Sequence, residues 1–221
     1  LRMAVGMANG GKIAMIDTEN GRGLHHADEF QFDYVPFEAP FSPARYVEAL
    51  VAAEKYGAAV TIIDSMSHSH DGEGGVLEMH EAELDRMAGS DLRKRERVSP
   101  AAWIKPKAAH KKLVYKLLQT RMNIIVCMRA AEKLKIAQAG GKTEFINAGY
   151  KPIVGKGLEF EMACMLMLPP GANGVPDLDP GLSKIPSVLA SIFPVGAQIN
   201  EEMGAALARW AAGSSASTNQ A

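Results

Sequence analysis

The chain has 221 residues, of which 47% are hydrophobic and 22% charged, and this is enough for one sizeable α/β core. Its 24 basic and 25 acidic residues give a net charge of −1, so bulk charge does not mark it as a polyanion-binding protein. No apolar run reaches the length of about 18 residues that a membrane helix needs, and no signal peptide is recognisable. We therefore expect neither membrane insertion nor secretion, and we expect Cys127 and Cys164 to be buried free thiols in the strands predicted around them, as in a reducing cytoplasm.

The chain opens on what reads as the second half of a helix. Residues 1–9 have no N-terminal cap and no initiator Met, and Gly10 and Gly11 form the stop signal. We therefore expect a further segment upstream. A buried strand follows at residues 12–17. Residues 33–37 form a shorter strand, which Pro36 places near a sheet edge.

The middle of the chain predicts a strand between helices. Ser42 and Pro43 open a helix that Gly57 ends. The elements expected after it are a central strand (60–64), a polar loop (65–75), an acidic helix (76–87), a basic connector (89–99) and a long basic helix (100–121).

The last third is less regular. The elements expected there are strands at 123–128, 162–168 and 190–193, a mobile loop or β-hairpin at 130–152, and a helix at 200–210. Strands that alternate with helices predict an α/β fold with a mainly parallel sheet covered on both faces. We expect one core over residues 1–212 and a disordered tail over 213–221.

Two apolar strands end in carboxylates, and this is the strongest functional signal in the sequence. Asp17 ends the first strand and Glu19 follows it, while Asp64 ends the second and Ser65 follows. Parallel strands bring their carboxyl ends to one edge of a sheet, where open α/β proteins build their sites. Asp64 is expected to hold Mg²⁺, which prefers oxygen ligands, and Glu19 to orient and deprotonate an attacking water. Asp17 either contacts the ligand or hydrogen-bonds the loop. The simpler alternatives are an acid that caps the next element for Asp64 and a solvated strand-end acid for Glu19.

The neutral total charge hides an acidic block followed by a basic one. Residues 71–91 hold seven acids against one base, and residues 93–121 hold ten bases against one acid. Cations interleaved with aromatic rings suit single-stranded nucleic acid, whereas the simpler alternative is a solvated helix face with its tryptophan in the core. The nucleic-acid candidates are Arg95, Arg97, Trp103, Lys105, Lys107 and Lys111.

Other polar residues are weaker candidates. Arg129, expected at the end of a central strand, would sense a γ-phosphate or pair with an acid. Lys156 would reach a phosphate across a subunit boundary or be a surface lysine. His68 and His70 lie in a loop whose spacing matches no closed zinc site, so we favour a polar loop near the phosphates or a neighbouring subunit. Gly-Gly-Lys-Thr at 140–143 is not a phosphate loop, because Ile136 stands where the first glycine is required.

The order of these segments resembles the RecA-like P-loop ATPases. The segments are KIAMIDTEN (12–20), VTIIDSMSH (60–68), NIIVCMR (123–129) and GKGLEFEMACMLML (155–168). The resemblance covers residues 1–168 and is strongest to the phage-type AAA/RecA-like ATPases of single-strand annealing and recombination. In this family the first strand and the Walker A phosphate loop lie immediately before the helix that residue 1 continues. The resemblance therefore implies an N-terminally truncated core.

The resemblance implies roles for individual residues. Glu19 would be the catalytic glutamate, Asp64 the Walker B aspartate that holds Mg²⁺, and Ser65 its neighbour. Arg129 stands where the family commonly has a glutamine sensor, and Lys156 lies near a segment that approaches a neighbour's nucleotide. The implied protein is an ATPase in its intact form, with ATP and Mg²⁺ as ligands, single-stranded DNA and further copies of itself as partners, and the host cytoplasm as its location if it is encoded by a phage.

Two other functions stay open at this point. One is a non-catalytic nucleic-acid-binding module on the same fold, and the other is a P-loop kinase-like transferase that acts on a small molecule.

Overall fold

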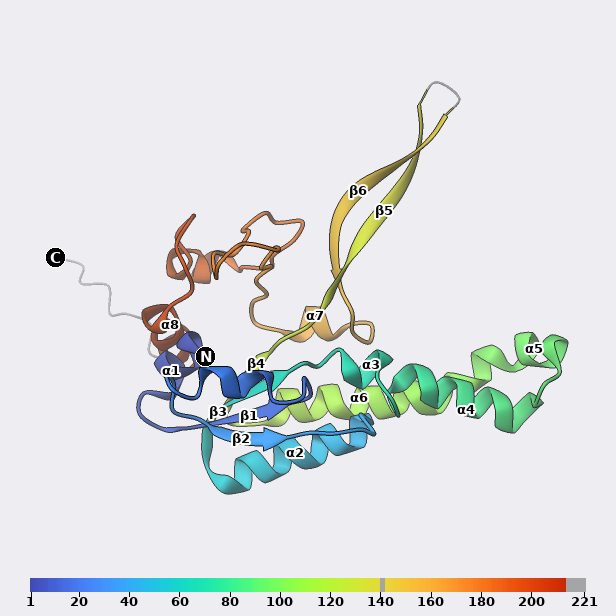
Figure 1. The fold of residues 1–221 in the computed structure, drawn as a ribbon, viewed down its shortest axis with the longest axis horizontal. Helices are drawn as coiled ribbons and strands as arrows, with labels where there is room; N and C mark the ends of the chain where they lie inside the picture. The colour runs from blue at the N-terminus through green and yellow to red at the C-terminus, as the bar shows by residue number, and fades with distance from the viewer. Residues whose placement is uncertain (140–141, 214–221) are drawn as a thin grey trace.

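The computed structural model describes residues 1–139 and 142–213. Its centre is a four-stranded, fully parallel sheet with the strand order β2-β1-β3-β4, and helices lie against both faces (Figure 1). The strands are β1 (Lys12–Asp17), β2 (Asp33–Pro36), β3 (Ala58–Asp64) and β4 (Asn123–Val126). The predicted class, an α/β fold with a parallel sheet flanked by helices, is confirmed.

Alternation along the strands explains why both faces of the sheet are covered. Ile13 and Met15 of β1 point to one face and pack with Val60 and with α1 (Arg2–Ala8). The intervening residues point the other way, because successive side chains of a strand alternate between faces. That opposite side holds the main core, which α2 (Pro43–Tyr56) and α6 (Ile104–Gln119) complete. The fully buried members of this core are Ile16, Tyr46, Leu50, Ile63, Met66, Leu113 and Leu158.

The predicted boundaries of α2 are confirmed. Ser42 is extended and precedes Pro43 at the first position of the helix, where proline's missing N–H is not needed. Gly57 ends the helix with a φ of 81°, and its N–H donates to the carbonyls of Ala53 and Glu54.

The predicted connector at 89–99 is wrong, because most of it is helical. α5 (Leu92–Ala102) begins at Asp91, whose side chain accepts a hydrogen bond from the Lys94 amide at 3.0 Å. It packs on α4 (Val76–Ala88), and the two helices form an arm that extends away from the sheet (Figure 1). The predicted long helix at 100–121 is also divided, since Trp103 separates α5 from α6.

The segment at 130–152 is a β-hairpin, which was one of its two predicted forms. β5 (Ala130–Ala139) pairs antiparallel with β6 (Lys142–Pro152) in a separate two-stranded sheet. The hairpin projects from the body of the molecule, away from the α4–α5 arm (Figure 1).

Two predicted strands in the last third are wrong. Residues 162–168 make only isolated bridges, Met165 with Lys184 and Met167 with Asp177. Residues 190–193 fall mainly in a 3₁₀ helix, η2 (Ser187–Ile192). The remaining short helices are η1 (Arg22–His26), α3 (His68–Asp71) and α7 (Leu158–Glu161).

The last helix, α8 (Glu201–Ala211), confirms the prediction for residues 200–210. The Asn200 side chain caps it by accepting a hydrogen bond from the Met203 amide at 3.0 Å. The tail predicted from 213 lies outside the described residues, apart from Gly213 itself. None of the described helices is both long and apolar enough to cross a bilayer.

Both cysteines are free thiols, as predicted, and both are only partly exposed. Neither lies within a strand, since Cys127 follows β4 and Cys164 lies in the bridged segment. Burial raises the pKa of Cys127 to about 12, so this thiol is protonated at neutral pH.

Glycines allow α1 and α8 to pack in close contact. A Cβ atom at Gly6 would lie 1.8 Å from the Glu201 carbonyl oxygen, and one at Gly204 would lie 2.0 Å from the Met3 carbonyl oxygen. Both clashes are with backbone, which cannot move aside as a flexible side chain can. The first helix is therefore fixed to the last through two positions that must lack a side chain.

Gly204→Ala is expected to destabilise the protein by about 1–3 kcal/mol or more, because the added methyl group overpacks this contact. Thermal unfolding of the variant should show a lower melting temperature than the wild type. Arg209→Ala, at an exposed position of the same helix, is the control and should leave the melting temperature nearly unchanged. Equal melting temperatures for Gly204→Ala and the wild type would contradict the packing.

Candidate functional site

The carboxyl ends of β1 and β3 bring two acidic residues side by side. Asp17 and Asp64 are direct partners in the register of this parallel pair, and neighbouring strands are about 4.8 Å apart. Glu19 follows two residues after Asp17. The strand register thus places the carboxylates of Asp17 and Asp64 at one edge of the sheet, as predicted.

Thr18 joins the two strand ends by hydrogen bonds. Its amide donates to the Asp64 carbonyl at 2.7 Å, and its hydroxyl oxygen accepts from the Ser65 amide at 2.7 Å. The buried Tyr46 hydroxyl of α2 donates to the Ser65 carbonyl at 3.1 Å. The Asp64–Ser65 peptide bond is cis. The backbone after both strands is therefore held in place on several sides.

Asp17 shapes the loop that follows β1. It is 2% exposed, and its two carboxylate oxygens accept hydrogen bonds from the amides of Glu19 at 2.6 Å and Gly23 at 3.0 Å. Of the two roles considered from the sequence, hydrogen bonding to the loop is the one these contacts fulfil. Asp17 thereby fixes where Glu19 leaves the strand.

Burial and like charges act on Asp64. Its pKa is raised above the ordinary value, first by burial, then by the charges of Glu19 and Asp17, while Arg22 opposes the shift. Three acidic side chains thus contribute negative potential to a half-buried place. This electrostatic arrangement attracts a cation, and its oxygen donors suit a hard divalent ion such as Mg²⁺.

Ser65 carries an unsatisfied polar atom. Its side-chain oxygen is buried and has no hydrogen-bond partner among the described residues. Buried hydroxyl groups without a partner are uncommon in native proteins and are costly. A group that adds a partner beside Asp64 would satisfy this atom.

His68 of α3 also reaches this edge. Its Nδ1 lies 2.7 Å from the Thr18 hydroxyl, and its Nε2 lies 3.9 Å from the Glu19 carboxylate. The ring of Phe41 stacks on the imidazole at 4.9 Å. From the sequence, His68 was expected in a polar loop near the phosphates or a neighbouring subunit, but no spacing pattern shows that α3 turns its first residue toward Thr18 and Glu19. Arg22, which acts on Asp64, was likewise missed.

Arg129 lies beyond the end of β4, which is an edge strand and not the central strand expected for this residue. Its guanidinium pairs with Asp71 of α3 at 2.5 Å, and its amide donates to the Ser67 hydroxyl at 2.9 Å. Of its two predicted roles, pairing with an acid is the one observed. Lys156 is exposed in the segment before α7, and no contact joins it to the strand-end carboxylates in the described part of the chain.

The loop at 65–75 shows no metal cluster. Among the side chains that the structure describes, no group of three or more histidine, cysteine or acidic residues is arranged to hold a metal ion. A Mg²⁺ ion that keeps most of its waters needs only one or two carboxylates, so this finding does not bear on the role expected of Asp64.

The acidic and basic blocks of the sequence partly neutralise each other. Arg95 pairs with Glu81 at 2.6 Å and also with Asp85, both on α4. Lys105 pairs with Glu83 at 2.7 Å.

Trp103 is also engaged within the molecule. Its ring stacks on the buried His80 with ring centroids 4.1 Å apart. The remaining nucleic-acid candidates, which the structure leaves exposed, are Arg97, Lys107 and Lys111.

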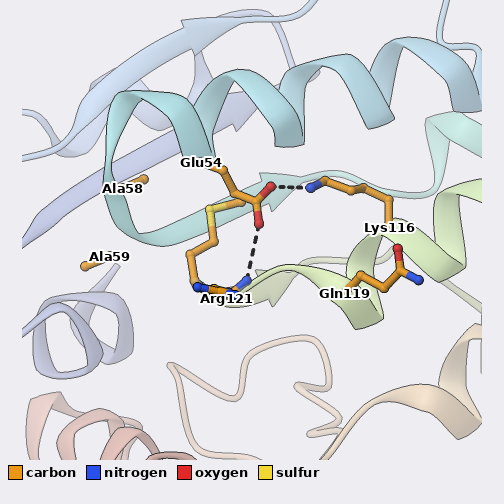
Figure 2. Close-up of a pocket in the computed structure, with 7 residues that line it drawn as sticks. Glu54, Ala58, Ala59, Lys116, Gln119 and Arg121 are labelled. Atoms are coloured by element: carbon orange, nitrogen blue, oxygen red, sulfur yellow. Dashed lines mark hydrogen bonds and ion pairs between the residues drawn. The ribbon is translucent and has the colours of Figure 1, made fainter.

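A further pocket is lined by residues of α2, of the start of β3 and of the end of α6 (Figure 2). It has a volume of about 580 Å³ and lies where β3 begins, at Ala58 and Ala59. Its acid, Glu54, accepts hydrogen bonds from Lys116, from Thr120 and from the Arg121 amide, which hold the pKa of Glu54 at about 2. Because the carboxylate of Glu54 is already hydrogen-bonded and the pocket lies at the opposite end of β3 from Asp64, we do not assign the site here.

Comparison with known proteins identifies no relative. No family model matches the chain, and neither a curated protein nor a solved structure matches it significantly. The function therefore has to be inferred from the residues and contacts of the site itself.

Asp64→Asn is expected to stabilise the protein at neutral pH. The pKa of Asp64 is raised in the folded state, so its charge opposes folding above that pKa and has no effect below the ordinary value of 3.8, where both states are protonated. The variant should therefore melt at a higher temperature than the wild type at pH 7, and the difference should shrink as the pH falls toward 4.

Glu48→Gln, at an exposed position of α2, is the matched control and should show no such pH-dependent gain. A lower melting temperature for Asp64→Asn at pH 7, or a gain that does not change with pH, would contradict the electrostatic account.

Proposed function

We propose that this chain is the core of a RecA-like ATPase of the phage type, which binds Mg²⁺ and ATP at the carboxyl edge of its sheet and acts on single-stranded DNA in recombination or annealing. The observation that carries the proposal is the pairing of Asp17 with Asp64 in register, with Glu19 beside them. Active sites of open α/β sheets lie at this edge.

The residues divide into different roles. Asp64 would hold Mg²⁺, whose charge would stabilise the negative charge that develops on transferring phosphate oxygens. Glu19 accepts a proton from water and orients it, and Asp17 keeps Glu19 in place through the loop. The unsatisfied Ser65 hydroxyl is available to the same ligands. The 221 residues contain no GxxxxGK[ST] motif, so the proposal concerns the metal-binding and water-activating part of the site.

The exposed lysines of α6 favour binding to a polyanion. The helix has five lysines and no acid. Lys105 and Lys116 are paired with glutamates from other helices. The other three are exposed and have no acidic partner among the described residues, and the half-exposed Tyr115 follows them on the same helix. These three residues are Lys107, Lys111 and Lys112.

An aromatic ring beside unpaired lysines fits single-stranded nucleic acid, whose phosphates pair with lysines and whose bases stack on rings. The ammonium of Lys111 lies 5.3 Å from the centre of the Tyr115 ring, so charge and ring share one surface. We infer that α6 contributes to DNA contact, together with the exposed Arg97 of α5, while Arg95, Trp103 and Lys105 mainly serve the helical arm.

Mg²⁺ should stabilise the wild-type chain, because cation binding relieves the repulsion around Asp64. Melting temperatures measured with and without millimolar Mg²⁺ test this. The stabilisation should be lost in Asp64→Asn and kept in the control Glu48→Gln. An equal Mg²⁺ effect in both variants would place the cation elsewhere.

Glu19→Gln should abolish ATP hydrolysis while sparing ATP binding, since the amide keeps the shape of the side chain but cannot accept the proton. A loss of roughly 10²–10⁴-fold in kcat is expected for removal of a general base. The assay uses the chain together with any residues that its gene encodes before Leu1, because these 221 residues lack a phosphate loop. Unchanged turnover in Glu19→Gln would refute the catalytic assignment, and Glu48→Gln is again the control.

Replacing Lys107, Lys111 and Lys112 together by alanine should weaken binding to a fluorescent single-stranded oligonucleotide. The plot of log K against log salt concentration should also become less steep by about 2, since each phosphate contact on a single strand contributes about 0.7. Lys105→Ala, which removes a lysine already paired with Glu83, is the control and should keep nearly the wild-type slope.

An equal loss of affinity per lysine in both variants would contradict the role of the α6 face. If DNA affinity is the same with and without ATP and the protein shows no ATP hydrolysis, the non-catalytic nucleic-acid-binding module is favoured instead.

A further inference from the structure

His68 lies between Thr18 and Glu19. No motif around His68 in the sequence predicts these two contacts. Its Nδ1 is 2.7 Å from the Thr18 Oγ1, and its Nε2 is 3.9 Å from the Glu19 Oε1. The two side chains of this pair, His68 and Glu19, are only 19% and 21% exposed, so solvent screens the contact weakly.

The hydrogen bonds of Thr18 favour one of the two neutral tautomers of His68. The Thr18 hydroxyl oxygen already accepts from the Ser65 amide at 2.7 Å, and the single hydroxyl proton needs an acceptor. Two acceptors are in reach, the Ser65 carbonyl at 3.2 Å and the His68 Nδ1 at 2.7 Å. The shorter contact favours Nδ1 as the acceptor of this proton. In the neutral imidazole the proton then sits on Nε2, which is the atom that faces Glu19.

The ring of His68 is also fixed in its plane. Phe41 stacks on it with ring centroids 4.9 Å apart and an angle of 24° between the planes. Among the described residues, His68 is the one side chain in polar contact with the Glu19 carboxylate. A separation of 3.9 Å is longer than a hydrogen bond, but contacts of this kind are often long before substrate binds and shorten in the complex.

We propose that His68 is a positioning residue for Glu19, whose Nε2–H holds one carboxylate oxygen so that the other faces the reacting water. This inference rests on the proposed function, because it assigns His68 a part in the chemistry of Glu19. The chain of contacts runs from the Ser65 amide through the Thr18 hydroxyl and the imidazole to the carboxylate. It ties the orientation of Glu19 to the ends of both β1 and β3.

The first test reads the tautomer of His68 in the present chain and needs no enzymatic activity. ¹⁵N NMR of the histidine side chains should show a protonated Nε2 and an unprotonated, hydrogen-bonded Nδ1 for His68. Thr18→Val should remove the hydrogen-bond signature of Nδ1, while Thr18→Ser keeps it. Glu19→Gln should shift the Nε2 resonance. A proton on Nδ1, or no response of Nε2 to Glu19→Gln, would overturn the proposal.

The second test compares two amides in the hydrolysis assay. The terminal nitrogen of glutamine lies near the position of Nε2, whereas that of asparagine lies near the position of Nδ1. His68→Gln should therefore keep most of kcat, and His68→Asn should lose roughly ten- to a hundredfold in kcat at nearly unchanged KM, as expected for a misplaced catalytic group. His26→Gln, at an exposed position in η1, is the control.

Equal losses in the glutamine and asparagine variants would overturn the positioning role. The two proposals fail in different ways. Absence of hydrolysis in the wild-type protein overturns the proposed function, whereas an Nδ1-protonated His68 overturns the positioning role whether or not the protein hydrolyses ATP.

Discussion

The in-register pairing of β1 with β3 is the constraint on which the site depends. It sets Asp17 opposite Asp64 at the carboxyl end of the sheet, where two like charges in a half-buried place oppose folding. Nearby groups reduce this repulsion, because two loop amides donate hydrogen bonds to the Asp17 carboxylate and the positive charge of Arg22 acts on Asp64. The remaining negative potential around Asp64 favours the binding of a cation.

Thr18 connects the elements around this edge. Its amide and hydroxyl bind the backbone after β3, and the same hydroxyl meets His68 of α3. The other end of α3 is joined to the root of the hairpin, since Asp71 pairs with Arg129 just before β5. Two residue pairs, one at each end of a single helical turn, thus connect the carboxylate edge with the projecting hairpin.

The parts of this structure that could be predicted from the sequence are those governed by local pattern. Apolar runs that end in Asp17 and Asp64 identified the central strands and the edge where they meet. The helix at 92–102 was missed because its charged run has no apolar periodicity, and ion pairs such as that of Arg95 with Glu81 hold it to α4. Residues 162–168 resembled a strand by composition, but no neighbouring strand is available to them beyond isolated bridges to Asp177 and Lys184. His68 was not assigned because its contacts depend on how three separate segments fold together.

One edge of the described sheet limits how copies of this protein can associate. β2, the strand at that edge, is only four residues long, and its Pro36 has no N–H to offer a further strand. A short edge interrupted by proline is a poor template for strand addition, so continuous sheets that grow from one copy to the next are disfavoured. Contacts between copies on this side of the sheet would therefore use side-chain surfaces, which can separate without breaking the backbone hydrogen bonds of a sheet.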